Sequence, residues 1–266
     1  MVKYLRVFSF TAAIFLLLSS CVRNKTQSGD YPILPVPFTS VRLTDNFWAP
    51  RIKKNADITI PIAFHYCETT GRIRNFEIAG GLDTGKFQSI FPFDDSDVFK
   101  IIEGASYSLQ TFPDPKLDAY LDALIYKIGL AQEEDGYLYT NRTIAEMHGG
   151  EGLHGWANKK RWLNDSISSH ELYNLGHLYE AAAAHYQATG KRSLLEIALK
   201  SADLVNRDFG RDMVNVAVGI VWQTTLTLIP IYLVIRGYTE LGICGLLLVL
   251  TSVFLKKNWY DKLEEA

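Results

Sequence analysis

Hydrophobic positions in the middle of the chain, from about residue 55 to residue 210, recur with the period of an α-helix. One set has the spacing i, i+3, i+4, i+7, i+11: Val98, Ile101, Ile102, Ala105 and Leu109. Two more sets are similar: Leu117, Leu121, Leu124 and Ile128 after Pro115, then Leu195, Ala198, Ala202 and Val205. Short connections with Gly, Pro or Asp separate them. We therefore expect an all-α fold, an array of antiparallel helix pairs.

Helix start and stop signals sharpen this picture. The carboxylates of Asp94–Asp97 suit an N-cap and first turn, and Ser168 and Glu171 have the spacing of a capping box. Gly190 and Gly210 are expected to end the helices that precede them. The two segments that do not fit a helix are Gly136–Thr140 and His148–Gly155.

The hydrophobic pattern changes after residue 210. Met213–Ile235 is a run without a charged residue, and Leu241–Leu255 is a second. At a rise of about 1.5 Å per residue the first run can cross a hydrocarbon core of roughly 30 Å. The second run crosses only if the intervening turn is drawn in or the bilayer thins. We expect a transmembrane helical hairpin over 213–255 and a polar tail over 256–266; the alternative is a buried helix pair in a soluble core.

The first residues have the layout of a secretory signal peptide. Two basic residues precede an apolar run over Val7–Leu18, and small residues lead to Cys21. The segment Leu18-Ser19-Ser20-Cys21 resembles a bacterial lipobox, which makes Cys21 the expected lipidation site. An uncleaved anchor helix is the alternative. We expect residues 1–21 to be a lipoprotein-type signal, 22–35 a linker, and the protein to be exported and membrane-associated.

Charge and cysteine content exclude several classes of function. The chain has 27 basic and 29 acidic residues, a net charge of −2, so it lacks the basic surface that binds nucleic acid. Cys21, Cys67 and Cys244 lie far apart, so their spacing predicts neither a disulfide framework nor a local metal site. No nucleic-acid partner is expected.

A first candidate site is the acidic segment that begins the helix near residue 95. Asp95 and Asp97 follow two phenylalanines in Phe91–Lys100, and carboxylates beside aromatic rings suit a sugar-binding cleft. Helix capping and a favourable dipole position explain the same residues without a ligand.

A second candidate site is a polar stripe on a predicted helix. His170, Tyr173, Asn174 and His177 are three, four and seven residues apart and share a helix face. The two histidines are separated by roughly 10.5 Å along the axis, too far for one ion, so no metal site is predicted. Hydrogen bonding to a polyhydroxylated ligand fits, and a satisfied buried histidine pair is the alternative.

Several segments in order carry a family resemblance. They are Val36-Pro37-Phe38, Val41-Arg42-Leu43, Phe47-Trp48, Thr70–Phe76, Asp95–Lys100, Ala131-Gln132, Asp135–Leu138, Arg161-Trp162, His170–Tyr173, Gly176-His177 and Ala188–Lys191. In this order they resemble the β-L-arabinofuranosidases of glycoside hydrolase family 127, over about residues 36–210. The resemblance implies an (α/α)6 barrel, of which 36–210 would be a part, and a carbohydrate substrate.

The resemblance also implies a retaining reaction with a cysteine nucleophile near zinc and a glutamate acid/base. These groups belong to the later half of family members and have no matching positions here. Only His170, His177, Asp95 and Asp97 carry over, as substrate-binding residues. Zinc is expected in complete members and no cofactor in this chain.

These points lead to two functional expectations. The first is a glycoside hydrolase for β-L-arabinofuranosides or related glycans that is truncated before its catalytic half and inactive alone. The second is a noncatalytic, membrane-attached sugar-binding or assembly protein. Since part of a barrel leaves an apolar wall exposed, a second chain that completes it is a possible partner.

Overall fold

The computed structural model describes residues 36–149, 161–162 and 168–261. The expected signal segment, Cys21 and the linker lie outside these residues, as does much of the predicted non-helical segment His148–Gly155. The chain divides into two units, Met1–Ser40 and Val41–Ala266, and the described end of the first contains the short 3-10 helix η1 (Phe38–Ser40). The described part of the chain contains helices and turns and no strand, so the predicted all-α class is confirmed.

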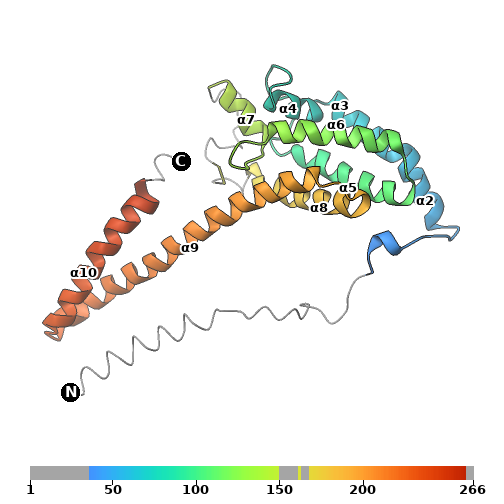
Figure 1. Ribbon diagram of the computed structural model, residues 1–266. Coiled ribbons are helices and arrows are strands. Elements are labelled where there is room, and N and C mark those ends of the chain that lie inside the picture. The colour runs from blue at the N-terminus through green and yellow to red at the C-terminus, as the bar shows by residue number, and fades with distance from the viewer. Residues whose placement is uncertain (1–35, 150–160, 163–167, 262–266) are drawn as a thin grey trace. The chain divides into compact units, whose positions relative to one another are not determined.

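The elements of the second unit follow one another in a simple order (Figure 1). They are α2 (Trp48–Lys54), η2 (Asn55–Thr59), α3 (Ile60–Thr69), α4 (Arg72–Ala79), α5 (Asp95–Thr111), α6 (Pro115–Ala131), α7 (Thr140–Met147), α8 (Glu171–Thr189), α9 (Ser193–Val234), α10 (Tyr238–Leu255) and η4 (Lys256–Tyr260). Helix α5 packs along α8, α8 packs on the first part of α9, and α4 packs on α6. These contacts make the predicted array of helix pairs.

One apolar core holds the array together. Its largest fully buried apolar side chains come from α4, α5, α6, α7, α8 and α9: Phe76, Phe99, Ile102, Leu121, Ile125, Ile128, Ile144, Leu178 and Leu194. The ring of Phe76 meets the edge of Phe99 at a centroid distance of 5.7 Å. Burial of these side chains supplies the main free energy of folding for this unit.

The predicted helices around residues 98–109 and 117–128 are confirmed as α5 and α6. Helix α6 starts as its sequence indicates, because the Asp114 carboxylate accepts hydrogen bonds from the N–H groups of Lys116 and Leu117, and Pro115 occupies the first helical position. Both helices bury the apolar face that their period predicts.

Three local predictions were wrong. Helix α9 does not end at Gly210 but continues to Val234. Its buried face is Leu194, Ile197, Ala198, Ser201 and Leu204, largely one residue out of step with the predicted face. The predicted N-cap is wrong as well, since α8 begins at Glu171 with His170, not Ser168, as its N-cap. The sequence analysis also overlooked the irregular segment 80–94 between α4 and α5.

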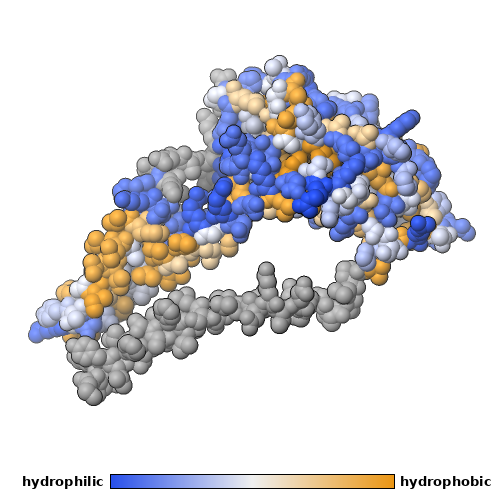
Figure 2. All heavy atoms as spheres, viewed as in Figure 1, coloured by the Kyte–Doolittle hydropathy of each residue, from blue (hydrophilic) through white to orange (hydrophobic). Residues whose placement is uncertain are grey.

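The apolar end of the chain forms a helical hairpin. Helix α10 folds back on the second part of α9 after a turn that contains Arg236 in the left-handed conformation, with φ of 57°. The indole Nε1 of Trp222 donates to Ser252 Oγ at 2.8 Å and joins the two helices. Both helices are long and apolar enough to cross a membrane. Only 6% of the apolar stretch that qualifies each helix is buried inside the protein. Figure 2 shows hydrophobic residues gathered along this hairpin.

Candidate functional site

The residue that precedes α8 is a histidine in a strained backbone conformation. His170 has φ of 53° and ψ of 39°, in the left-handed region that residues with a Cβ rarely occupy. Its ring is held edge-on against Phe93 at 4.7 Å, and Tyr173 lies 6.2 Å away. Strain of this kind persists where the surroundings hold it, and it is concentrated at binding and catalytic sites.

His170 belongs to a row of rings, which we call the aromatic row: Phe91, Phe93, His170, Tyr173 and His177. The two phenylalanines stack at 5.4 Å, and the Tyr173 ring meets His177 edge-on at 4.6 Å. Tyr173 is about half exposed, at 47%. The row therefore offers partly exposed ring faces and imidazole nitrogens next to one another.

Asp97 lies at the edge of this row, on α5. Its carboxylate accepts from Arg72 Nε at 2.8 Å and is 3.6 Å from Lys100 Nζ. The Lys100 ammonium also lies 4.9 Å from the centre of the Tyr173 ring. Asp97 thus fixes the cations beside the aromatic row and remains partly exposed.

Asp95 has a different environment, although it is only two residues away. It is 1% exposed, and its carboxylate accepts from the backbone N–H and the hydroxyl of Thr140. Burial raises the pKa of Asp95 to about 7, against the opposing effect of the two hydrogen bonds. Its visible role is to cap the N-terminus of α7.

Glu171, which the sequence analysis considered only as part of a capping box, is a buried carboxylate that supports the same region. Glu171, 3% exposed, accepts from the Tyr137 hydroxyl, from the Trp162 N–H at 2.9 Å and from Ser169 Oγ at 3.0 Å. Burial and the charge of Glu171 raise the pKa of Tyr137 well above its usual range. This network ties the segment before α7 to the residues that set the backbone of His170.

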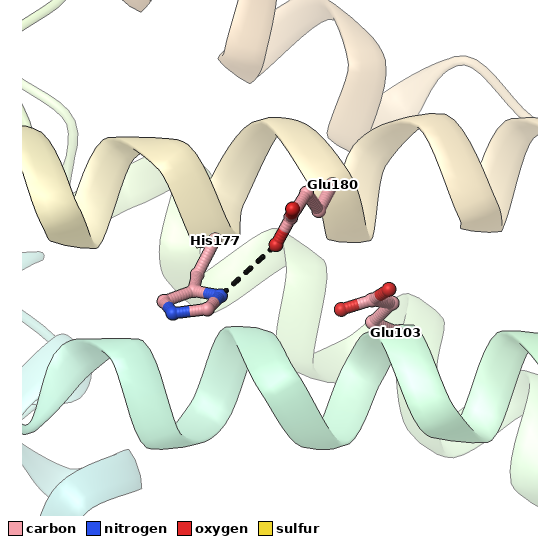
Figure 3. Close-up of side chains that lie close together, drawn as sticks. All are labelled: Glu103, His177 and Glu180. Atoms are coloured by element: carbon pink, nitrogen blue, oxygen red, sulfur yellow. Dashed lines mark hydrogen bonds and ion pairs between the residues drawn. The ribbon is translucent and has the colours of Figure 1, made fainter.

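His177, the other predicted histidine, faces two carboxylates across the α5–α8 pair. Its Nδ1 lies 3.1 Å from Glu180 Oε2, and Glu103 of α5 approaches from the facing helix (Figure 3). The Tyr107 hydroxyl donates to Glu103 at 2.9 Å. The structure therefore brings His170 and His177 together through Tyr173, and Asp97 through Lys100.

Asn174 was expected on the same polar stripe but is fully buried. Neither of its side-chain amide atoms has a hydrogen-bond partner, and the same holds for Asn141 in α7. An uncompensated buried amide costs free energy.

The cysteines do not reproduce the zinc site that the resemblance implies. Cys67 is 3% exposed in the apolar core, and burial raises the pKa of its thiol to about 11. Cys244 is buried in α10. In the described residues neither cysteine belongs to a group of three metal-binding side chains. Burial therefore disfavours the thiolate form of Cys67.

The fold and the aromatic row define an all-α domain of paired helices with rings, imidazoles and a carboxylate beside the α5–α8 pair. Residues 40–220 match the family model described as the β-L-arabinofuranosidase, GH127 catalytic domain. The match covers more than half of the chain, so the protein belongs to the GH127 family.

Individual relatives agree with this assignment. A non-reducing end β-L-arabinofuranosidase of Bifidobacterium longum subsp. longum is 39% identical over 138 residues, which are 52% of this chain and 20% of that protein. A solved GH127 β-arabinofuranosidase is 55% identical with a TM-score of 0.61, covering 66% of this chain and 27% of that one. The GH127 β-L-arabinofuranosidase Ara127N-Se from Geobacillus stearothermophilus T6 is 40% identical with a TM-score of 0.55, covering 62% and 25%. The chain thus spans about a fifth to a quarter of these relatives.

Proposed function

We propose that the GH127 part of this chain binds a terminal β-L-arabinofuranose unit, or a closely related sugar, along the aromatic row. The strained backbone of His170 is the observation that carries this proposal. Phe93 packs against the imidazole and the Glu171 network holds the neighbouring residues, and backbone strain held in this way is concentrated at binding sites. Half-exposed Tyr173 offers a ring face for the sugar, while His177 and Asp97 offer polar atoms at its edge.

The test is binding of methyl β-L-arabinofuranoside to the full chain in detergent micelles, followed by ligand-observed NMR. His170→Ala should abolish the saturation-transfer signal, and Tyr173→Ala should weaken it severalfold. Tyr126→Ala is the matched control, because Tyr126 is an exposed tyrosine on α6, away from the row. Equal signals from the wild type, His170→Ala and Tyr126→Ala would exclude the aromatic row as the binding site.

We also propose that this chain alone does not hydrolyse glycosides. In support, the Cys67 thiol is buried with a raised pKa, so the thiolate needed for attack is disfavoured. Incubation with an aryl β-L-arabinofuranoside, zinc and a thiol reductant should release no aryl alcohol above a protein-free blank. Release that depends on His170 would contradict this.

A second candidate function is a membrane-attached sugar-binding or assembly protein, and the exposed hairpin favours it. Val214, Leu233, Leu246 and Leu250 are each about half exposed, and they lie on the second part of α9 and on α10. We propose that α9 and α10 cross the bilayer and hold the GH127 part at its surface, together with a lipid on Cys21 after export. The array itself exposes apolar side chains such as Tyr126, which a second chain could cover.

Thiol labelling of intact spheroplasts tests the hairpin. Single cysteines at Glu134, Tyr238 and Lys257, all at exposed positions, would be placed in a chain whose Cys67 and Cys244 are replaced. If the hairpin crosses twice, the cysteines at positions 134 and 257 lie on the same side of the membrane and the cysteine at position 238 lies on the other. A membrane-impermeant reagent should then label both of the first two and not the third, or the third alone. Labelling of all three sites in intact spheroplasts would exclude a spanning hairpin.

A further inference from the structure

The end of α8 brings an imidazole close to two carboxylates of α6. Asp118 and Asp122 are one helical turn apart, so they share a face of α6, and His185 lies on α8. One oxygen of each carboxylate and a ring nitrogen of His185 all lie within 4.8 Å of one another. None of these residues takes part in the aromatic row or in the Glu171 network.

His185 is the unusual member of this group. It is 0% exposed, and neither Nδ1 nor Nε2 has a hydrogen-bond partner. A neutral imidazole carries one donor and one acceptor, so two bonds are missing inside the protein. Such a group calls for an additional ligand, because unmade hydrogen bonds in the interior cost free energy. Burial and the Lys191 ammonium lower the pKa of His185, which keeps the ring in the neutral form that binds metal ions.

The two carboxylates already bracket a positive charge. Lys191 Nζ lies 2.7 Å from Asp118 Oδ1 and 2.7 Å from Asp122 Oδ2. Lys191 follows Gly190, the left-handed residue that ends α8, and about a third of its side chain is exposed. Its ammonium can therefore turn out into solvent. Partly exposed ion pairs of this kind contribute little to stability, so a cation that binds the carboxylates more strongly can replace the ammonium.

We propose that Asp118, Asp122 and His185 form a binding site for a divalent transition-metal ion of the zinc class, whose place Lys191 occupies in the metal-free chain. Two carboxylates balance the charge of the ion, and one imidazole makes the set suit zinc or cobalt better than the all-oxygen sites that magnesium and calcium prefer. The ion would cross-link α6 to α8. These ligands differ from the cysteine and glutamate set that the family resemblance implies.

The group of Glu103, His177 and Glu180 in Figure 3 is the natural control. It has the same composition of one histidine and two carboxylates within the same 4.8 Å limit. However, the Nδ1 of His177 already has Glu180 as a partner, and Tyr107 donates to Glu103. It therefore lacks the buried, unpartnered nitrogen that points to a ligand at His185.

The experiment is titration of the full, chelator-treated chain in detergent with zinc chloride, followed by calorimetry, and with cobalt chloride, followed by visible absorption. We expect one ion per chain, with oxygen and nitrogen ligand-field bands for cobalt. Asp122→Asn and His185→Gln should each weaken binding at least tenfold, and Glu103→Gln should leave it unchanged. Lys191→Met should tighten binding severalfold, since the competing ammonium is gone, and a merely structural lysine would not produce this gain.

Three results would overturn the proposal. The first is the absence of metal binding in both the wild type and Lys191→Met. This comparison does not depend on whether the ligand variants fold, because Lys191→Met keeps all three ligands. The second is loss of binding in Glu103→Gln, which would place the ion at the control group. The third is a cobalt–thiolate charge-transfer band, which would place it on a cysteine.

Discussion

The carboxylate of Asp95, the first residue of α5, accepts two hydrogen bonds from Thr140, the first residue of α7. One comes from the backbone N–H, a group that the start of a helix leaves without an internal partner. A side chain of one helix therefore caps another helix, 45 residues later in the chain. The price of this connection is a buried carboxyl group, which makes the stability of the protein depend on pH.

We expect the free energy of unfolding to fall between about pH 4 and pH 7 because of Asp95. Its pKa in the folded chain is raised to about 7 from 3.8, so the folded state holds a proton that the unfolded state releases in this range. The stabilisation is complete below pH 4 and lost as pH rises through 7. At about 1.4 kcal/mol per pKa unit the change is at most about 4 kcal/mol.

Two substitutions isolate this effect in unfolding curves measured between pH 4 and pH 8. Asp95→Asn removes the titration and should flatten the curve over this range, relative to wild type. Thr140→Val removes a donor that favours the ionised form, so it should lower stability more at pH 8 than at pH 5. If Thr140→Val lowers the free energy of unfolding equally at pH 5 and pH 8, Asp95 does not change its protonation state between these pH values.

Gly136→Ala should destabilise the chain by about 2–4 kcal/mol. Gly136 has φ of 105°, and a Cβ there would lie 2.3 Å from the backbone oxygen of Lys200 in α9. The Lys200 backbone cannot move away from such a Cβ without loosening α9 from the helix array. Gly104→Ala is the matched control, because Gly104 lies inside α5 with open space around it and should gain up to about 1 kcal/mol. Thermal unfolding of the full chain in detergent measures both, and a neutral Gly136→Ala would refute the close approach.

His170→Gly should be more stable than His170→Ala by about 1 kcal/mol, the reverse of the usual order. Both variants lose the contact with Phe93, but alanine keeps the cost of the left-handed backbone and glycine does not. At His177, within α8, alanine should be the more stable replacement by about 1 kcal/mol. Melting temperatures of the four variants decide the point, and the same order at both positions would mean that His170 is unstrained in solution.

The helices that depend on local sequence were predictable, and contacts between distant segments were not. The start of α6 depends on neighbours in sequence: Pro115 is its first residue, and the Asp114 carboxylate accepts from Lys116 and Leu117. A local sequence pattern is therefore enough to predict this start. The sequence predicted a start at Ser168, but α8 begins at Glu171, whose carboxylate accepts in the interior from Tyr137, 34 residues earlier. The local pattern does not contain that contact. Gly210 failed as a stop signal because one glycine costs a helix only about 1 kcal/mol.

The same division holds for the candidate site. The spacing of His170, Tyr173 and His177 predicted one helix face, but His170 is the left-handed residue that precedes α8. The three rings nevertheless lie in one row. Sequence alone treated Asp95 and Asp97 alike, yet the fold buries one against Thr140 and leaves the other beside Arg72. The difference arises because Arg72 lies on α4 and Thr140 on α7, and the spacing of residues within Asp94–Asp97 carries no information about these partners.

Trp222 and Ser252 should be energetically coupled by about 0.6 kcal/mol, and by no more than about 2 kcal/mol, in a double-mutant cycle of Trp222→Phe and Ser252→Ala. The indole donates to the hydroxyl across the α9–α10 hairpin, and helix-to-helix hydrogen bonds in micelles or bilayers have coupling energies of this size. Thr227 gives the control cycle with Ser252, since its hydroxyl bonds to Gln223 within α9 and Thr227→Val should show no coupling. The measurement is detergent-driven unfolding of the full chain by circular dichroism. Coupling of zero for Trp222, or equal coupling for Thr227, would mean that α10 does not pack on α9 through this hydrogen bond.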